Sequence, residues 1–279
     1  MFGLKPHGLI GYLVLTAAFV MCCWAQEASR PVARTIEVGG HRIQVAEAGS
    51  AKVLVVFVSG LGEDWHTWDK VQPRVAGFAR TISYDRAGIG GSDGVSGPRD
   101  VAVLVDELRQ TLYRAGHSPP FVLVGHSLGG AVIAEFARAH SDEVAGLVFV
   151  DPEDQRLLDR LEQQLPAGLW QERQAALARA MPSVPPAAQA ELRGMAESRH
   201  SAGLLQTELP ITLLTGTLKN PQFPGNPLEQ DLKLEIHRSD LRQMQRALHL
   251  LVPESRHYIQ NDAPDTVVTA IRDLVVSLR

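Results

Sequence analysis

Ser127 stands at the centre of the pentapeptide Gly-His-Ser-Leu-Gly, directly after the apolar run FVLV and directly before a helical pattern. A Gly-x-Ser-x-Gly sequence between a strand and a helix makes a sharp turn with strained backbone at the serine. Gly125 and Gly129 remove side chains that would clash where strand and helix approach each other. The turn holds the hydroxyl out at the strand end, beside the positive end of the helix. The pattern predicts a nucleophile at Ser127, against the alternative of a turn with a chance serine.

With this turn the chain resembles the α/β-hydrolase family, and the resemblance runs from about residue 35 to the end. In that family the central serine is the nucleophile, which maps onto Ser127. The segment FVSGLGED resembles the loop whose backbone binds the oxyanion of acyl transfer. The resemblance implies that the N–H groups of Leu61 and Leu128 are the donors. Ser59 stands where many relatives have histidine, which does not affect a backbone donor; the alternative is a flexible glycine-rich turn.

A general base is expected in a loop after the last strand. The segment VPESRHYIQNDAPD places His257 there, at the position that matches the family's catalytic histidine. A lone loop histidine is more often solvated, yet the position of this one is fixed by the rest of the pattern. His126, next to the nucleophile, is expected to point away from Ser127 and to serve in packing.

The acid that should orient the histidine is missing from its usual place. Many relatives carry it a few residues beyond the strand ITLLTG, where this chain has Lys219 and Asn220. Other members, pancreatic-type lipases among them, carry it at the end of the preceding strand. This chain has Asp151 there, in VFVDPED. We therefore expect Asp151 to be the acid.

Two alternatives to that assignment stay open. Glu153 and Asp154 lie close enough in sequence to replace Asp151 as the acid. Asp151 followed by Pro152 is also a common helix start, in which the carboxylate would only cap the helix. Trp65 and Trp68 follow the oxyanion segment and either line the substrate pocket or belong to the core.

Alternating strand and helix patterns predict the elements that position these residues. The fold class is α/β, a mostly parallel, doubly wound sheet with a helical cap insertion at about residues 155–208, in a hydrolase domain over residues 34–279. A hairpin around Gly39 and Gly40 should form an antiparallel edge. Buried strands are expected at 52–60, 79–88, 120–127, 145–154, 211–216 and 248–252, with helices at 100–115, 128–140, 228–247 and 264–278.

Composition limits the partners. The 279 residues carry 27 Lys and Arg against 31 Asp and Glu, without long runs of one sign, which argues against nucleic acid or an anionic membrane surface. The first residues combine Lys5, an apolar run from Leu9 to about Cys23, and Ala25, the pattern of an export signal cleaved after Ala25. The run is shorter than the ~20 residues of a spanning helix, so no stable membrane insertion is expected after cleavage.

The two cysteines, Cys22 and Cys23, would leave with that signal. We therefore expect no disulfide framework, no thiol catalysis and no thiolate metal site in the mature chain. The expected localisation is periplasmic or secreted. Oligomeric state does not follow from the sequence.

Together these patterns lead us to expect an exported serine hydrolase that cleaves small carboxylic esters through an acyl-enzyme, with no metal and no organic cofactor. Epoxide hydrolase and haloalkane dehalogenase chemistry are disfavoured, because those relatives have an aspartate nucleophile where this chain has Ser127. Acyl transfer, amide or peptide cleavage and cofactor-free perhydrolysis with the same residues remain alternatives. A protein of the same fold that binds a ligand with little turnover is another.

Overall fold

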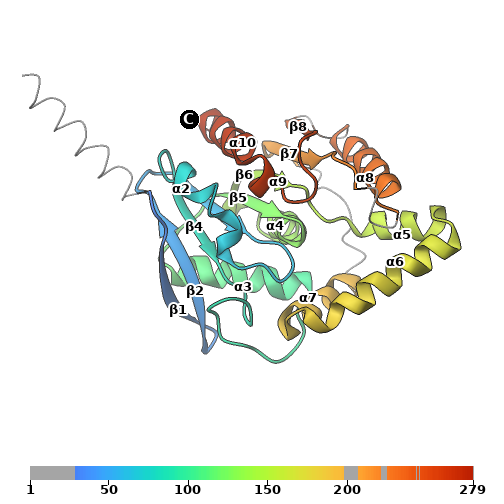
Figure 1. The fold of residues 1–279 in the computed structure, drawn as a ribbon. Coiled ribbons are helices and arrows are strands. Elements are labelled where there is room, and N and C mark those ends of the chain that lie inside the picture. The colour runs from blue at the N-terminus through green and yellow to red at the C-terminus, as the bar shows by residue number, and fades with distance from the viewer. Residues whose placement is uncertain (1–28, 198–206, 221–224, 243, 245, 279) are drawn as a thin grey trace, which may run out of the picture.

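Eight strands form one sheet in the order β1-β2-β4-β3-β5-β6-β7-β8 (Figure 1). The computed structural model describes residues 29–197, 207–220, 225–242, 244 and 246–278. The expected signal, residues 1–25, therefore lies outside the described residues. Within the sheet the pairs β1–β2 and β2–β4 are antiparallel and the other five are parallel, which confirms the predicted mostly parallel α/β architecture.

The N-terminal hairpin forms one edge of the sheet, as predicted. β1, Val32–Val38, pairs with β2, His41–Ala48, along its whole length. Gly39 and Gly40 make the connecting turn with φ of 58° and 87°, a left-handed conformation that glycine adopts without steric cost. β1 is the edge strand, and the alternation of buried and exposed residues over its last three positions suits a strand with one covered face.

The remaining strands are parallel and mostly apolar, because helices cover both of their faces. Their carboxyl ends therefore lie at the same edge of the sheet, where the loops after β3, β5, β6 and β8 can meet. These strands are β3, Leu54–Val58; β4, Arg80–Tyr84; β5, Phe121–His126; β6, Val144–Val150; β7, Ile211–Gly216; and β8, Ala247–Val252.

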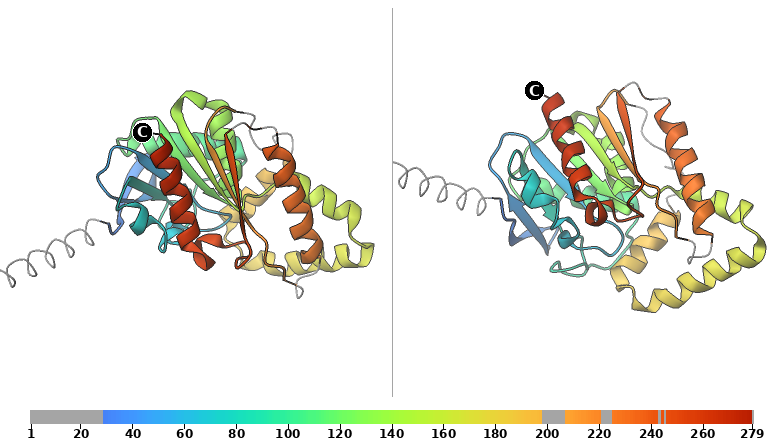
Figure 2. Two further views of the ribbon diagram at one scale, coloured as in Figure 1. Left: turned by 90° about the horizontal axis from the view of Figure 1, so that it is seen from above. Right: turned by 45° about the horizontal axis from the view of Figure 1, so that its top comes forward.

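Helices pack on the two faces and enclose two apolar cores (Figure 2). On one face lie α3, Val101–Arg114, and α4, Leu128–Ala139. On the other lies α10, Pro264–Ser277. Short elements complete the layers: η1, Trp65–Trp68; α2, Gln72–Val75; η2, Ser141–Glu143; and α9, Ile259–Asp262.

Three helices are inserted between β6 and β7 and extend beyond the sheet (Figure 1). They are α5, Gln155–Gln164; α6, Ala167–Ala180; and α7, Pro186–Glu197, with η3, Met181–Ser183, between the last two. The expected helical insertion is thus present over residues 155–197, and its last part, 198–206, lies outside the described residues.

The helix after β7, α8, spans Asn226–Leu241 and ends before the predicted 247. It ends early because the chain must already pair with β7 from Ala247 onward. A third apolar cluster joins α8 to α5 through Leu157, Leu161, Leu165, Leu232 and Ile236. The inserted helices are therefore anchored to the main domain by leucine packing.

Candidate active site

Ser127 occupies a strained turn between β5 and α4. Its φ is 50° and its ψ is −118°, outside the regions that ordinary residues prefer. The flanking glycines are required by space, since a Cβ on Gly129 would lie 2.1 Å from the carbonyl oxygen of Val58. A Cβ on Gly125 would lie 2.4 Å from the carbonyl oxygen of Gly129. The predicted nucleophile turn is present in its geometry, and Ser127 is 8% exposed.

Asp151 and His257 lie side by side, as the sequence predicted. Asp151 follows β6 with φ of 45°, and its backbone N–H donates to the carbonyl oxygen of Leu214 on β7. Nδ1 of His257 lies 2.8 Å from Oδ2 of Asp151. A carboxylate can only accept here, so Nδ1 carries the proton and Nε2 is left as the basic nitrogen.

The environment makes Asp151 a permanent anion. Its side chain is fully buried, and burial alone raises the pKa of a carboxyl group. The positive charge of Lys233 and the hydrogen bonds from His257 and Lys233 outweigh that effect, so the pKa of Asp151 lies below its usual range. Lys233, on α8, has Nζ 2.8 Å and 2.7 Å from the two carboxylate oxygens. Nothing in the sequence pattern pointed to Lys233 as part of this site.

His257 responds in the opposite sense. Burial lowers its pKa, but the hydrogen bond to Asp151 and the charge of that residue raise it by more, and the net pKa lies above the ordinary value. Its side chain remains 39% exposed, whereas that of Asp151 is not exposed at all. A base that is reachable on one side and anchored to a buried anion on the other is the arrangement expected for proton transfer.

The two alternative acids occupy different surroundings. Asp154 accepts the backbone N–H of Arg156 as the N-cap of α5, and its carboxylate also binds the Arg156 side chain. Glu153 lies near His257, and burial raises the pKa of its carboxyl. His257 donates its Nδ1–H to Asp151 and not to either of these carboxyl groups, which favours Asp151 over both.

Two further hydrogen bonds connect the Ser127 turn to the loops of Asp151 and His257. The N–H of Glu153, two residues after Asp151, donates to the carbonyl oxygen of Ser127 over 3.1 Å. Nε2 of His126 lies 3.0 Å from the carbonyl oxygen of His257. Among the described residues, the Ser127 hydroxyl itself makes no hydrogen bond. A serine–histidine contact therefore has to tighten in the substrate complex, as is common for such pairs.

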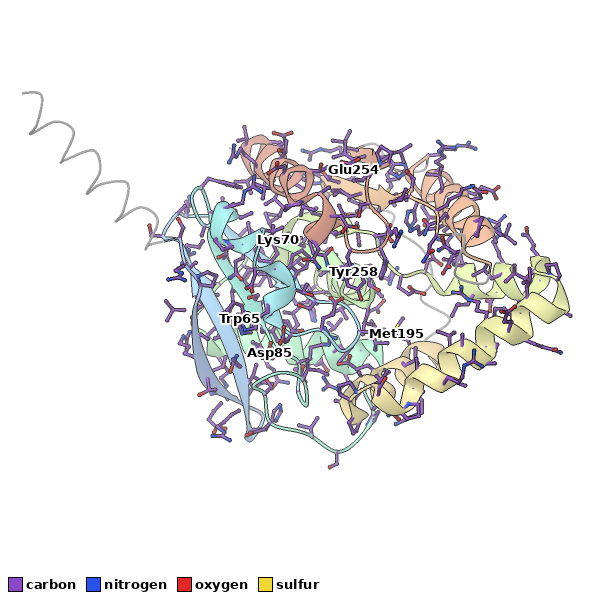
Figure 3. All side chains as sticks on the ribbon, in the orientation of Figure 1. Trp65, Lys70, Asp85, Met195, Glu254 and Tyr258 are labelled. Atoms are coloured by element: carbon purple, nitrogen blue, oxygen red, sulfur yellow. The ribbon has the colours of Figure 1, made fainter. Side chains whose placement is uncertain are left out.

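His126 does more than the packing that the sequence suggested. Its side chain is fully buried, and Nδ1 lies 3.0 Å from Oε2 of Glu63. The same carboxylate oxygen accepts the N–H of Gly60 over 2.8 Å. Burial raises the pKa of Glu63, but the hydrogen bond from His126 and the charge of that ring lower it, to about 2. Tyr258, which directly follows His257 (Figure 3), packs its ring against that of His126.

The two expected oxyanion donors lie on adjacent backbone segments. Leu61 follows β3 and Leu128 is the first residue of α4. The end of β3 touches the start of α4, because a Cβ on Gly129 would also lie 2.9 Å from the carbonyl oxygen of Ser59. Neither N–H has a hydrogen-bond acceptor within the described part of the chain. Both are thus available to an oxyanion.

A buried arginine fixes the loop that contains Leu61. Arg86 donates to the carbonyl oxygens of Ser59 and Gly60 over 2.7 Å and 2.6 Å. It is held in turn by Glu191 of α7, at 2.8 Å from Nε and 2.9 Å from Nη2. Neither side chain exceeds 1% exposure. Nothing in the sequence pattern indicated that the partner of Arg86 would come from an inserted helix.

The tryptophans divide between the two possibilities. Trp68 is fully buried, packs on Phe57 with ring centroids 4.9 Å apart, and donates to Ser59 Oγ. It is a core residue, and the suggestion that it lines a pocket is wrong. Trp65 is half-buried and its backbone N–H donates to Asp85 (Figure 3), so its side chain stays a predicted pocket residue.

Within the described residues, no group of three or more His, Cys, Asp or Glu side chains is placed to hold a metal ion. The described helices also include none that combines the length and apolar character of a membrane span.

Comparisons with known proteins bear on the family and the fold of the chain. A sequence model described as the alpha/beta hydrolase family matches residues 55–270, well over half of the chain. An uncharacterised protein of Schizosaccharomyces pombe is 41% identical over 81 residues, 29% of this chain and 15% of that protein. Epoxide hydrolase 3 of Xenopus tropicalis is 31% identical over 109 residues, 38% of this chain and 29% of that enzyme. The alignments thus cover less than a third of either relative.

The solved structures give the fold over nearly the whole chain. A putative lipase from Acinetobacter baumannii superposes with a TM-score of 0.69 at 18% identity, covering 93% of this chain and 96% of the lipase.

Proposed function

Since the chain belongs to the alpha/beta hydrolase family, we propose that it is a serine hydrolase that cleaves small carboxylic esters. The observation that carries this proposal is the Asp151–His257 hydrogen bond, whose loops are tied to the strained turn of Ser127. The putative lipase among the structural neighbours supports ester chemistry as the starting hypothesis.

In the proposed reaction, Oγ of Ser127 attacks the acyl carbon while Nε2 of His257 takes the hydroxyl proton. The tetrahedral intermediate collapses, the bond to the alkoxy oxygen breaks, and His257 returns the proton to the departing alcohol. Water then attacks the acyl-enzyme with His257 as base, and a carboxylic acid leaves. Asp151 keeps Nδ1 protonated and stabilises the imidazolium in both halves of the cycle.

The N–H groups of Leu61 and Leu128 bind the oxyanion in this proposal. Both stand at the carboxyl end of the sheet, and Leu128 adds the positive end of α4. Arg86 supports the first donor by holding the carbonyl groups of Ser59 and Gly60 in one orientation. Donors fixed in advance stabilise developing charge without reorganising during the reaction.

Epoxide opening is the chemistry suggested by the Xenopus relative's name, and the nucleophile argues against it here. The relatives that open epoxides or displace halide use an aspartate at the turn between strand and helix. This chain has Ser127 there, which suits acyl transfer through an ester intermediate.

The first test is steady-state hydrolysis of p-nitrophenyl butyrate by the wild-type protein, Ser127→Ala and Ser141→Ala. Ser141 is an exposed serine at the opposite end of β6, so its variant controls for the loss of a hydroxyl as such. We expect turnover by the wild type and the control and none above background by Ser127→Ala. Equal turnover by all three would exclude Ser127 as the nucleophile. Three folded but inert proteins would direct the search to amides, acyl acceptors and ligand binding.

A further inference from the structure

A lysine is buried against the acid of the proposed site. Lys233 lies on α8, and its side chain is 7% exposed. Its Nζ lies within 2.8 Å of both oxygens of Asp151. A charged side chain this far from water is expensive unless it is paired, and here the partner is the same carboxylate that binds His257.

The carboxylate of Asp151 has little accepting capacity left. Oδ1 accepts the N–H of Gly216 over 2.9 Å and one bond from Lys233. Oδ2 accepts from Lys233 and from Nδ1 of His257. The carboxylate that should stabilise a protonated histidine is therefore shared with the amino group of Lys233.

We propose that Lys233 is a positioning residue that acts through Asp151 and makes His257 a weaker base than an unshared aspartate would. The proposal rests on the proposed function for its kinetic consequence, although its effect on His257 itself exists in the resting protein. A weaker base is deprotonated at lower pH, so the enzyme keeps its activity further into the acid range.

The other groups around His257 do not take over this role. Asp151 and Glu153, both from the loop after β6, act on the ring with negative charge and favour its protonated form. The rings of His126 and Tyr258 pack against it at centroid distances of 4.7 Å and 5.4 Å. Behind His126 lies the carboxylate of Glu63. Lys233 acts on the ring in the opposite sense, because its charge lowers the pKa of His257.

Two histidines lie near Lys233, and burial favours the neutral form of both rings. Burial lowers the pKa of His237, one turn later, to about 4, so that ring is neutral near neutral pH. Burial likewise lowers the pKa of His249 on β8. Both rings bind the hydroxyl of Thr215 at 2.8 Å.

A purely structural role would give a different result from the proposed one. The helix is already anchored by Leu232 and Ile236, which pack on the leucines of α5. Replacing one member of a buried ion pair changes stability whatever its role in the reaction. Only an effect of Lys233 on the basicity of His257 predicts a shift in the pH dependence of kcat/KM.

The kinetic test measures kcat/KM for p-nitrophenyl butyrate against pH for the wild type, Lys233→Gln and Lys219→Gln. Lys219 is an exposed lysine paired with Asp231, so it controls for the loss of a charge. We expect the acid limb of Lys233→Gln to move up by about one pH unit, the size expected for a nearby charge. The profile of Lys219→Gln should match the wild type. If the glutamine variant does not fold, Lys233→Met is the second neutral variant.

A second measurement is independent of turnover. Histidine ring resonances are titrated by NMR in the Ser127→Ala protein with and without Lys233→Gln, with the His257 signal assigned by its loss in His257→Gln. A higher titration midpoint in the lysine variant supports the proposal even if the protein hydrolyses no ester, which separates its fate from that of the proposed function. A folded lysine variant whose midpoint and acid limb are both unchanged overturns it.

Discussion

The side chain of Asp151 has two neighbours that compete for one charge, and this makes its replacement informative. In Asp151→Asn the amide keeps a hydrogen-bonding group near His257 but removes the anion and the constraint on its tautomer. We expect kcat for ester hydrolysis to fall by ~10⁴ with little change in KM. Glu153→Gln, which neutralises the neighbouring carboxyl near the same ring, should lose far less. Near-normal turnover by the asparagine variant together with a large loss in Glu153→Gln would move the acid to Glu153.

At the scale of the element, α7 connects the inserted helices to the loop of Leu61. Glu191 of this helix is fully buried and binds Arg86 and Arg99. In Glu191→Gln the two guanidinium groups lose one compensating charge in a dry environment. We expect the free energy of unfolding to fall by about 3 kcal/mol, because removal of one partner leaves a buried charge unpaired.

Urea denaturation measures that loss, with Glu172→Gln as the control. Glu172 is exposed on α6, so its variant should stay within about 0.5 kcal/mol of the wild type. An equal decrease in the free energy of unfolding of both variants would mean that the buried ion pair stabilises the fold no more than an exposed glutamate does. Esterase kinetics on the same proteins would show whether loss of the Arg86–Glu191 pair also lowers the activity that depends on the Leu61 loop.

For the whole molecule, the buried histidine of α8 makes stability depend on pH. Burial lowers the pKa of His237 from 6.5 to about 4, so the unfolded chain binds this proton more readily than the folded one. Its contribution is fully present above pH 6.5 and is lost as the pH falls toward 4. His257, whose pKa is raised, acts in the opposite direction and is stabilising when protonated.

We expect the stability lost between about pH 7.5 and about pH 5 to be smaller in His237→Gln than in the wild type, by about 2 kcal/mol. Urea unfolding at the two pH values measures it. His66→Gln removes an exposed histidine, and this variant should lose as much stability between the two pH values as the wild type does. An unchanged pH dependence in His237→Gln would show that this ring is not what makes the fold sensitive to acid.

Export also concerns the whole molecule and stays a prediction. The apolar segment before Ala25 predicts removal of residues 1–25, so the mature chain should begin at Gln26. N-terminal sequencing of protein recovered from the periplasm or the medium checks this. An intact Met1 in the recovered protein would contradict cleavage.

The fold and the turn at Ser127 could be predicted because they depend on local pattern, whereas His257 and Asp151 were expected from the resemblance to the family and from their places in strand-end loops. A buried strand, a glycine-flanked serine and a following helix are contiguous in sequence, and parallel topology brings the strand-end loops together. Lys233 and Glu191 could not be predicted, since each meets its partner only when a distant helix docks. The partners are Asp151, 82 residues away, and Arg86, 105 residues away. The role of Trp68 could not be predicted for a different reason. A tryptophan after the oxyanion segment is equally consistent with a pocket wall and with a core position.

The position of Asp151 on β6 has a consequence for how the chain can diverge. Residues 217–220, after β7, occupy the place where many relatives hold the acid, and here they carry Lys219 and Asn220. On the proposal that Asp151 orients His257 from the neighbouring strand, selection for catalysis does not act on the identity of those residues. Over generations this loop can accept substitutions and changes of length that relatives with their acid there cannot. Homologues of this chain should therefore show more sequence differences in residues 217–220 than in the turn around Asp151.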